Sequence, residues 1–205
     1  GDGDDVDATV HFAFAQAHDL DRSRNYMQAW RALVAMYLGH WDEAESLAGQ
    51  VLAREVEGST NRAMALVALG RLRTRRGDDT AVALLDEAKT LVERSGTLQR
   101  IAPVCAARAE AAWLAGNLHD VARESEAAYA LASEKSHHWF AGELAYWLRR
   151  AHRLPGNSAL CAEPYAHSLR GDWRLASACW TTLGCPYEAA CALAECDMAA
   201  LRAAL

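Results

Sequence analysis

The sequence Gly39-His-Trp41-Asp-Glu-Ala44 decides the fold, because related segments recur along the chain. In each of them a helical run ends at a glycine, a polar residue follows, and a new helix opens with a small residue on its inner face. The related segments begin at Gly77, Gly116 and Gly171. The first three glycines are separated by 38 and then 39 residues. A repeat of this length is typical of stacked helix pairs.

The composition also favours an all-α fold. Hydrophobic residues make up 52% of the 205 residues, Ala is frequent, and only four Pro occur. Ala is the strongest helix former, and its small side chain lets helices approach closely. No stretch alternates polar and apolar residues for long enough to form a strand. We therefore predict a right-handed superhelical stack of antiparallel helix pairs.

The domain organisation follows from the turn signals. Residues 1–7 are expected to form a flexible acidic leader, and residues 8–205 a single repeat domain that becomes irregular after about residue 136. Gly70 is expected where the two helices of one pair cross, and 155–158 form the clearest helix breaker. The expected helices are one ending near residue 19, then 22–38, 41–54, 60–76, 79–94, 98–115, 118–134, 140–153, one ending at 170, 173–183, 187–195, and a last one from Asp197.

Charge and hydropathy limit the partners. The net charge of −6 argues against direct contact with nucleic acid, which needs a basic surface. The one basic stretch, with Arg at positions 71, 73, 75 and 76, is interpreted as a solvated helix end that complements the helix dipole. No apolar run is long enough to span a membrane, and no signal peptide precedes the first helix, so we expect a cytoplasmic protein. The chain begins without Met and ends within a predicted helix, which indicates a piece of a longer protein.

Catalytic and metal-binding patterns are missing from the sequence. The six Cys include no C-x-x-C pair, so we interpret them as core residues in a reducing compartment and predict no metal site. Neither a G-x-S-x-G segment nor a G-x-x-x-x-G-K-[ST] phosphate loop occurs, and no other cofactor motif is present. We therefore expect a protein that is not an enzyme and that has no cofactor.

The repeat resembles the tetratricopeptide repeat. When Gly39 is placed at the glycine of that repeat, Ala32, Trp41, Ala44 and Val51 fall at its small, aromatic, alanine and small positions. The resemblance implies a tetratricopeptide-like α-solenoid. The spacing of 38–39 residues is longer than the 34 residues of that repeat.

The longer spacing resembles the superhelical sensor region of large ATP-binding LuxR-type transcriptional regulators, the maltose-activator-like proteins. Segments that carry this resemblance are 26–32, 69–73, 84–88, 107–116, 142–148, 162–165 and 183–190. The resemblance implies a sensor or interaction module of a bacterial regulator that relays binding to an attached ATPase and DNA-binding output. On its concave face it would bind a protein, a peptide or a small-molecule inducer, with no direct contact to nucleic acid or membrane.

Two other functions stay open. One is a purely structural scaffold or a module for self-association into homo-oligomers. The other is the helical array of an ATPase that is fused to a different output, such as a nucleotide cyclase.

The best candidate for a binding site lies in the interval where the glycine rhythm lapses, between Gly116 and Gly171. There the spacing places an aromatic stripe with one carboxylate and one guanidinium along one helix face. Aromatic residues and Arg concentrate binding energy at interfaces. The alternative is an interhelix packing face with a buried Glu143–Arg150 pair or with contacts to the neighbouring unit. The candidate site residues are Trp139, Glu143, Tyr146, Trp147 and Arg150.

Overall fold

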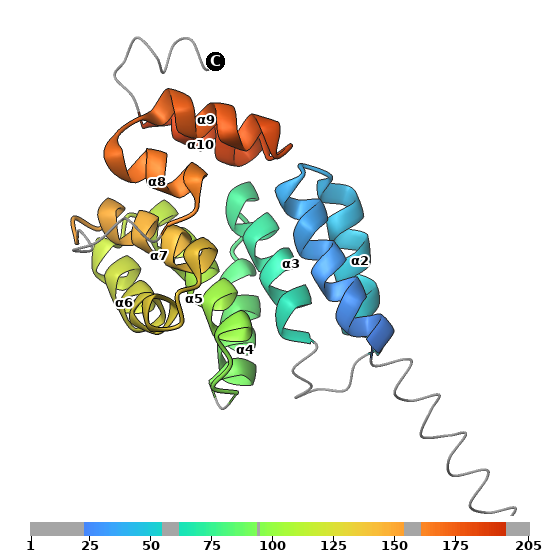
Figure 1. Ribbon diagram of the computed structural model, residues 1–205. Coiled ribbons are helices and arrows are strands. Elements are labelled where there is room, and N and C mark those ends of the chain that lie inside the picture. Colours follow the sequence, from blue (N-terminus) through green and yellow to red (C-terminus); the bar gives the residue numbers. More distant parts are fainter. Residues whose placement is uncertain (1–22, 55–61, 94, 154–160, 196–205) are drawn as a thin grey trace, which may run out of the picture.

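A computed structural model describes residues 23–54, 62–93, 95–153 and 161–195 (Figure 1). The described residues form helices and contain no strand, which confirms the predicted all-helical class. The expected leader, the first and last expected helices and the breaker at 155–158 lie outside these residues. No helix in the described ranges has the length and apolar character needed to cross a membrane.

The helix bounds agree with the sequence within about two residues at most ends. A first described helix covers 23–37 and is followed by α2 to α10. These are α2 (Trp41–Arg54), α3 (Arg62–Arg76), α4 (Ala81–Val92), α5 (Leu98–Leu114), α6 (Leu118–Glu134), α7 (His138–Arg150), α8 (Glu163–Arg170), α9 (Trp173–Thr182) and α10 (Pro186–Ala194).

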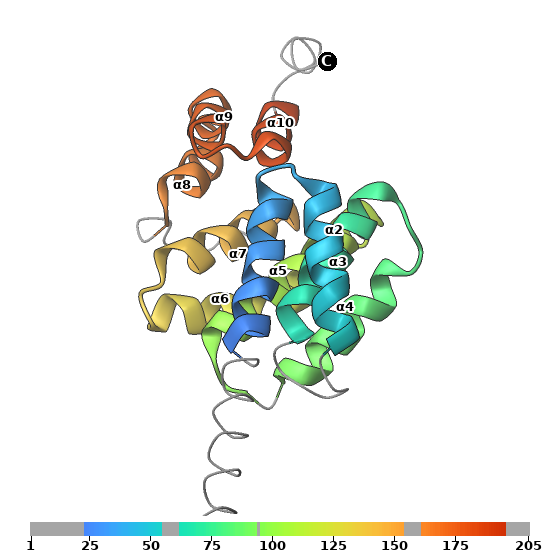
Figure 2. The ribbon, with the colours of Figure 1, turned by 90° about the vertical axis from the view of Figure 1, so that its right-hand side faces the viewer.

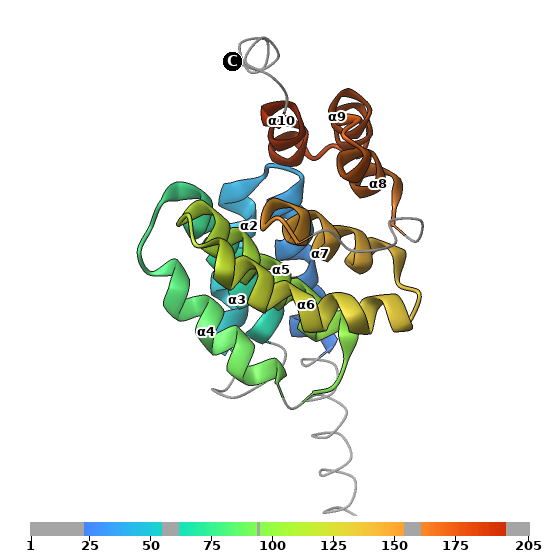
Figure 3. The same ribbon diagram turned by 90° about the vertical axis from the view of Figure 1, so that its left-hand side faces the viewer.

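The helices pack as consecutive pairs around an inner row. Each helix from α2 onward contacts the next one along the chain, and α5 also contacts both α3 and α7. Helices α3, α5 and α7 therefore lie side by side, with α4 and α6 outside them (Figure 3). We call the side of α3, α5 and α7 that faces away from α4 and α6 the inner face. Side chains that project from this side of the three helices share one surface.

A left-handed residue ends the helices at the predicted turns. Gly39, Gly77, Gly116 and Gly171 all have positive φ values, between 73° and 85°. At Gly39 the two hydrogen bonds of a Schellman turn form, from Gly39 N to the Met36 carbonyl (3.2 Å) and from His40 N to the Ala35 carbonyl (2.9 Å). Glycine suits this position because it carries no Cβ.

The regular spacing of left-handed helix ends continues between Gly116 and Gly171, where the repeated glycine segment is missing from the sequence. Ser136 and His152 also have positive φ, of 51° and 58°, and each closes the same pair of hydrogen bonds. His152 follows Gly116 by 36 residues, close to the earlier spacing. The expected irregularity from about residue 136 was therefore wrong for this turn, because residues other than glycine adopt the left-handed conformation there at a cost of roughly 1–2 kcal/mol each.

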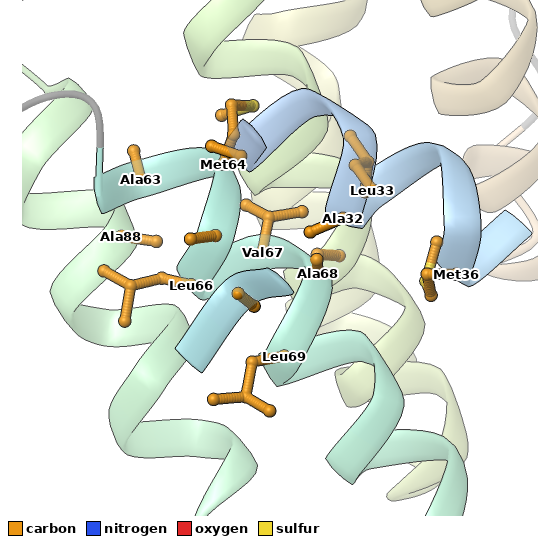
Figure 4. Close-up of a cluster of buried hydrophobic side chains, with 14 of the residues drawn as sticks. Ala32, Leu33, Met36, Ala63, Met64, Leu66, Val67, Ala68, Leu69 and Ala88 are labelled. Carbon is orange, nitrogen blue, oxygen red and sulfur yellow. The ribbon is translucent and has the colours of Figure 1, made fainter. Parts of the chain in front are cut away.

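Small residues let the helices approach closely within the first pairs. A Cβ on Gly70 would lie 2.6 Å from Leu85 Cδ2, which confirms that Gly70 marks the crossing of α3 and α4. The surrounding core is made of Ala, Leu, Val and Met side chains from the first helix and α2 to α5 (Figure 4).

The last helices return to the beginning of the chain. Helix α10 and the turn before it lie beside the turn that joins the first helix to α2 (Figures 1 and 2). Pro186 fills the space that a Cβ on Gly39 would occupy, and Leu38 packs near Gly184. The Trp41 and Tyr187 ring centroids are 6.2 Å apart. The described chain is thus closed by contacts between its first turn and α10.

Candidate functional site

Side chains from five helices meet on the inner row in a buried charge network, which we define as Tyr37, Arg71, Arg75, Glu110, Glu143 and Glu188. Arg71 and Arg75 lie one turn apart on α3 and therefore share a face. Both donate hydrogen bonds to Glu110 on α5, each from its Nε atom at 2.7 Å. Arg71 also donates to Glu143 on α7 at 2.6 Å, and Arg75 donates to Glu188 on α10 at 2.8 Å. The network thus joins α3, α5, α7 and α10, and Tyr37 adds the first helix.

Tyr37 is the first helix's contribution to the network. Its hydroxyl donates to Glu143 Oε1 at 3.1 Å and accepts a hydrogen bond from Arg71. Burial raises the pKa of Tyr37 well above the ordinary value, and the neighbouring carboxylate Glu143 adds to this. The hydroxyl therefore stays protonated and acts as a hydrogen-bond donor.

The network is withdrawn from water. The side chains of Arg71, Arg75, Glu110 and Glu143 are between 2% and 6% exposed, and that of Glu188 is 12% exposed. Charges at such depth need partners, because desolvation costs several kcal/mol for each ion. Two guanidinium groups face three carboxylates, so the network carries one surplus negative charge if all its carboxyl groups are ionised.

The ionised form of Glu188 is less favoured than that of Glu110. Burial acts to raise the pKa of Glu110, but the charges of Arg75 and Arg71 outweigh it and the pKa is lowered. Burial also raises the pKa of Glu188, and there Arg75 offsets it only in part, so the pKa stays raised. The two pKa values differ because Glu110 accepts hydrogen bonds from both Arg71 and Arg75. Glu188 accepts one hydrogen bond, from Arg75, which also binds Glu110.

Aromatic rings cover the guanidinium groups. Arg75 lies 3.7 Å from the ring centroid of Tyr187, and Arg150 lies 4.0 Å from that of Trp113. Both distances are within the range of cation–π attraction. Each arginine thus combines a carboxylate with an aromatic face, a pairing that is common in protein-binding surfaces.

A cavity of about 40 Å³ remains beside the network. A volume of this size accommodates a few water molecules and no metabolite. Its walls come from the network and from the aromatic and small side chains of α7 to α10, namely Tyr146, Trp147, Tyr165, Ser168, Trp180, Tyr187, Cys191 and Ala192. In this arrangement the inner face is occupied by the chain's own side chains.

Three of the five candidate site residues lie at this cavity. Glu143 belongs to the network, and Tyr146 and Trp147 line the cavity beside it. Trp139 lies apart, packed edge-to-face against Tyr165 and Trp180. These positions leave the binding role of the five residues a prediction.

The alternative of a Glu143–Arg150 pair was wrong. Glu143 pairs with Arg71, whereas Arg150 donates to Glu195 at 2.9 Å and stacks on Trp113. The two residues are two turns apart on α7, and each finds a partner on a different neighbouring element.

The interpretation of the basic stretch as a solvated helix end was wrong for two of its four arginines. Arg71 and Arg75 are buried, while Arg73 and Arg76 have side chains 30% and 38% exposed. The sequence offered one signal that these two arginines share a buried face, namely that positions 71 and 75 are one helical turn apart. Glu110 gave another, since it follows Ala106 and Ala107 at helical spacing on a buried face.

Cysteine chemistry and metal binding find little support in the described ranges. No group of three or more His, Cys, Asp or Glu side chains there has the geometry to hold a metal ion. Burial raises the pKa of Cys105, Cys185 and Cys191 to about 11, so the thiols stay protonated near neutral pH. A protonated thiol is a poor nucleophile.

Comparison of the chain with protein-family models, with curated proteins and with solved structures finds no match.

Proposed function

We propose that this chain is a non-catalytic binding module in which helix pairs form a right-handed, tetratricopeptide-like stack and the inner row is the concave face. The observation that carries the proposal is the buried charge network, in which Arg71 and Arg75 of α3 bind carboxylates of α5 and α7, and Arg75 also binds Glu188 of α10 from the far end of the described chain. An inner face that binds one helix through arginines and aromatic rings has the chemistry of a recognition surface.

The arrangement of the charges at Glu110 and Glu143 argues against a catalytic role for these two carboxylates. Glu110 and Glu143 are each held by arginine, and the pKa of Glu110 is lowered below its ordinary value because the two arginines outweigh burial. General acid–base catalysis at neutral pH requires instead a group with a pKa near the working pH. Hydrogen bonds from the arginines hold the carboxylates of Glu110 and Glu143 in fixed positions.

We further propose that the module serves a cytoplasmic bacterial transcriptional regulator and relays binding to an attached ATPase and DNA-binding output, as the resemblance to LuxR-type regulators implies. Such a relay requires that a ligand has different affinities for two arrangements of the module. Release of α10 from the inner row supplies a second arrangement. A small-molecule inducer would require that release, because the cavity of about 40 Å³ is too small for it.

Intrinsic tryptophan fluorescence tests the proposal, since Trp147 and Trp180 line the cavity and Trp41 contacts α10. Metabolites and candidate partner proteins are titrated while the molecular mass is followed by light scattering. A saturable, stoichiometric change in emission is expected for the true ligand. If emission changes only with protein concentration, together with an increase in mass, the chain is a self-association module or scaffold and the proposal is wrong.

Alanine variants at two candidate residues locate the site once a ligand is known. Trp139→Ala and Arg150→Ala are expected to weaken binding, because both side chains support the aromatic wall of the cavity. Unchanged affinity in both variants would remove these two residues from the site.

A further inference from the structure

One face of the first described helix carries large apolar side chains that remain exposed in the described chain. Met27 is 59% exposed, Val34 is 53% exposed, and Tyr26 beside them is exposed as well. Their spacing places the three residues on the same side of the helix. Apolar side chains that gather on one exposed face mark a place where another element packs. We define Tyr26, Met27 and Val34 as the exposed apolar face.

The equivalent positions are covered in the next two helices of the inner row. By the 38 and 39 residues between the turn glycines, the residues equivalent to Met27 and Val34 are Ala65 and Leu72 in α3, and Val104 and Ala111 in α5. The first three of these are 0% exposed, and the fourth is half-buried against the same core. That core includes the pair of helices before each, namely the first helix and α2 before α3, and α3 and α4 before α5. The face on the first helix stays exposed because no helix precedes it in the described ranges.

Residues 8–19, within which the sequence predicts a helix, have the pattern of the missing cover. The outer helices turn small and aliphatic side chains to the core at positions i, i+4 and i+7. These buried residues are Ala44, Ala48 and Val51 in α2, and Ala81, Leu85 and Ala88 in α4. Val10, Phe14 and Ala17 repeat the same spacing. The segment therefore offers one apolar side of the kind that the outer helices use.

The connection and the length of the segment also fit. Three residues, 20–22, separate it from Ser23, and three residues likewise separate α6 from α7, which pack against each other. So short a connection makes two helices antiparallel neighbours. A helix of residues 8–19 is about 18 Å long, so it reaches from Ser23 to about Val34 and spans the exposed apolar face.

We propose that residues 8–19 form a helix that covers the exposed apolar face, as α2 covers α3. The three apolar residues of the segment then lie against Met27 and Val34 and withdraw them from water. A row of repeated helix pairs needs such a terminal helix, because the apolar face of its end unit has no neighbour. The chain thereby closes this end of the row with its own segment, and the end is not left open for a partner.

Oxidation of Met27 by hydrogen peroxide measures the cover in the full chain. The peroxide transfers one oxygen atom to an accessible thioether sulfur, which gives the sulfoxide and water. Mass spectrometry of proteolytic fragments follows the rate. A synthetic peptide of residues 23–31 is the reference for an uncovered methionine, and Met36, which is 0% exposed, is the buried reference in the same molecule.

We expect Met27 to react at least fivefold more slowly in the full chain than in the peptide. A smaller difference would overturn the inference, because a side chain as exposed as Met27 is without the cover should react nearly as fast as in the peptide. This comparison uses the unmodified chain, so it does not depend on whether a variant folds.

Two matched variants identify the segment that covers Met27. Ala17 and Ala15 are two positions apart and therefore lie on opposite sides of a helix. Ala17→Asp places a charge on the apolar side and should speed oxidation of Met27 at least threefold. Ala15→Asp makes the same change on the other side and should leave the rate as it is. Equal rates in the two variants would overturn the inference; a slow rate at Met36 verifies that both variants are folded.

Dilution separates the segment from a second copy of the chain as the cover. Cover by residues 8–19 is intramolecular, so the oxidation rate of Met27 should stay constant when the protein is diluted a hundredfold. A rate that rises on dilution, together with a fall in mass measured by light scattering, would show that a second copy covers the face and would overturn the inference.

Discussion

The helix pairs before α7 and the helices after it are held together in different ways. In the first part, aliphatic side chains and Ala pack between helices that are near neighbours in the sequence. In the last part, α8 to α10 share an aromatic cluster around Tyr165 and Trp180, and α10 reaches Arg75, which lies 113 residues before Glu188. The first part depends on shape and small residues, whereas closure of the chain depends on a few specific polar and aromatic contacts.

The largest effect is expected when the network loses its central carboxylate. Glu110→Ala leaves Arg71 and Arg75 buried without their shared partner, and breaking a buried ion pair in this way costs about 3–5 kcal/mol. Urea unfolding measures the change. Glu126→Ala, at an exposed position on α6, serves as the control and should change the free energy of unfolding by no more than about 0.5 kcal/mol. Similar effects in the two variants would show that the charges hold nothing in place.

The packing of the first part is tested by Gly70→Ala. The new Cβ would lie 2.6 Å from Leu85 Cδ2, so we expect a loss of about 1–3 kcal/mol in the free energy of unfolding. Gly49→Ala is the matched control, because its Cβ meets nothing within 4 Å and α2 should gain about 0.5–1 kcal/mol. If both substitutions stabilise the protein, α3 and α4 do not cross at Gly70.

A pH series separates the two carboxylates of the network. Burial raises the pKa of Glu188 above its ordinary 4.5, so Glu188 favours folding at low pH and this contribution is lost as the pH rises through the raised value. Glu188→Gln should abolish that decline, because the amide does not titrate; urea unfolding at a series of pH values measures it. The pKa of Glu110 is lowered, since the arginines outweigh burial, so its contribution is present above 4.5 and is lost as the pH falls below it. If the decline persists unchanged in Glu188→Gln, Glu188 is not the carboxyl group that causes it.

The smallest expected effect concerns the turn at Ser136. Ser136→Gly relieves a left-handed conformation that costs about 1–2 kcal/mol for a residue with a Cβ, but it also frees the unfolded chain. We expect a net gain of about 0.5 kcal/mol, measured as a higher melting temperature. A clear loss of stability would mean that Ser136 makes a contact that outweighs its strain.

The sequence predicted the helices and the glycine turns because both depend on local signals. Gly70 was placed by spacing alone, and the structure agrees. The ends of the helices at 134 and 153 were expected, but the left-handed conformation of Ser136 and His152 was not, because these residues carry a Cβ.

The site was predictable only in part. Glu143 was found from its place on an aromatic helix face, but its partner Arg71 was read as solvated because charged residues near a helix end are usually exposed. Glu188 could not be assigned at all, because its burial depends on where α10 lies relative to α3. Contacts over more than 100 residues leave no periodic trace in the sequence.

A double-mutant cycle between Arg75 and Glu188 tests closure of the chain most directly. The free energies of unfolding are measured for Arg75→Ala, for Glu188→Ala and for the double variant. Contact between the two side chains predicts a coupling energy of at least about 1 kcal/mol, within the range found for paired residues. Effects that add within about 0.3–0.5 kcal/mol, as expected for distant sites, would show that Arg75 on α3 does not pair with Glu188 on α10.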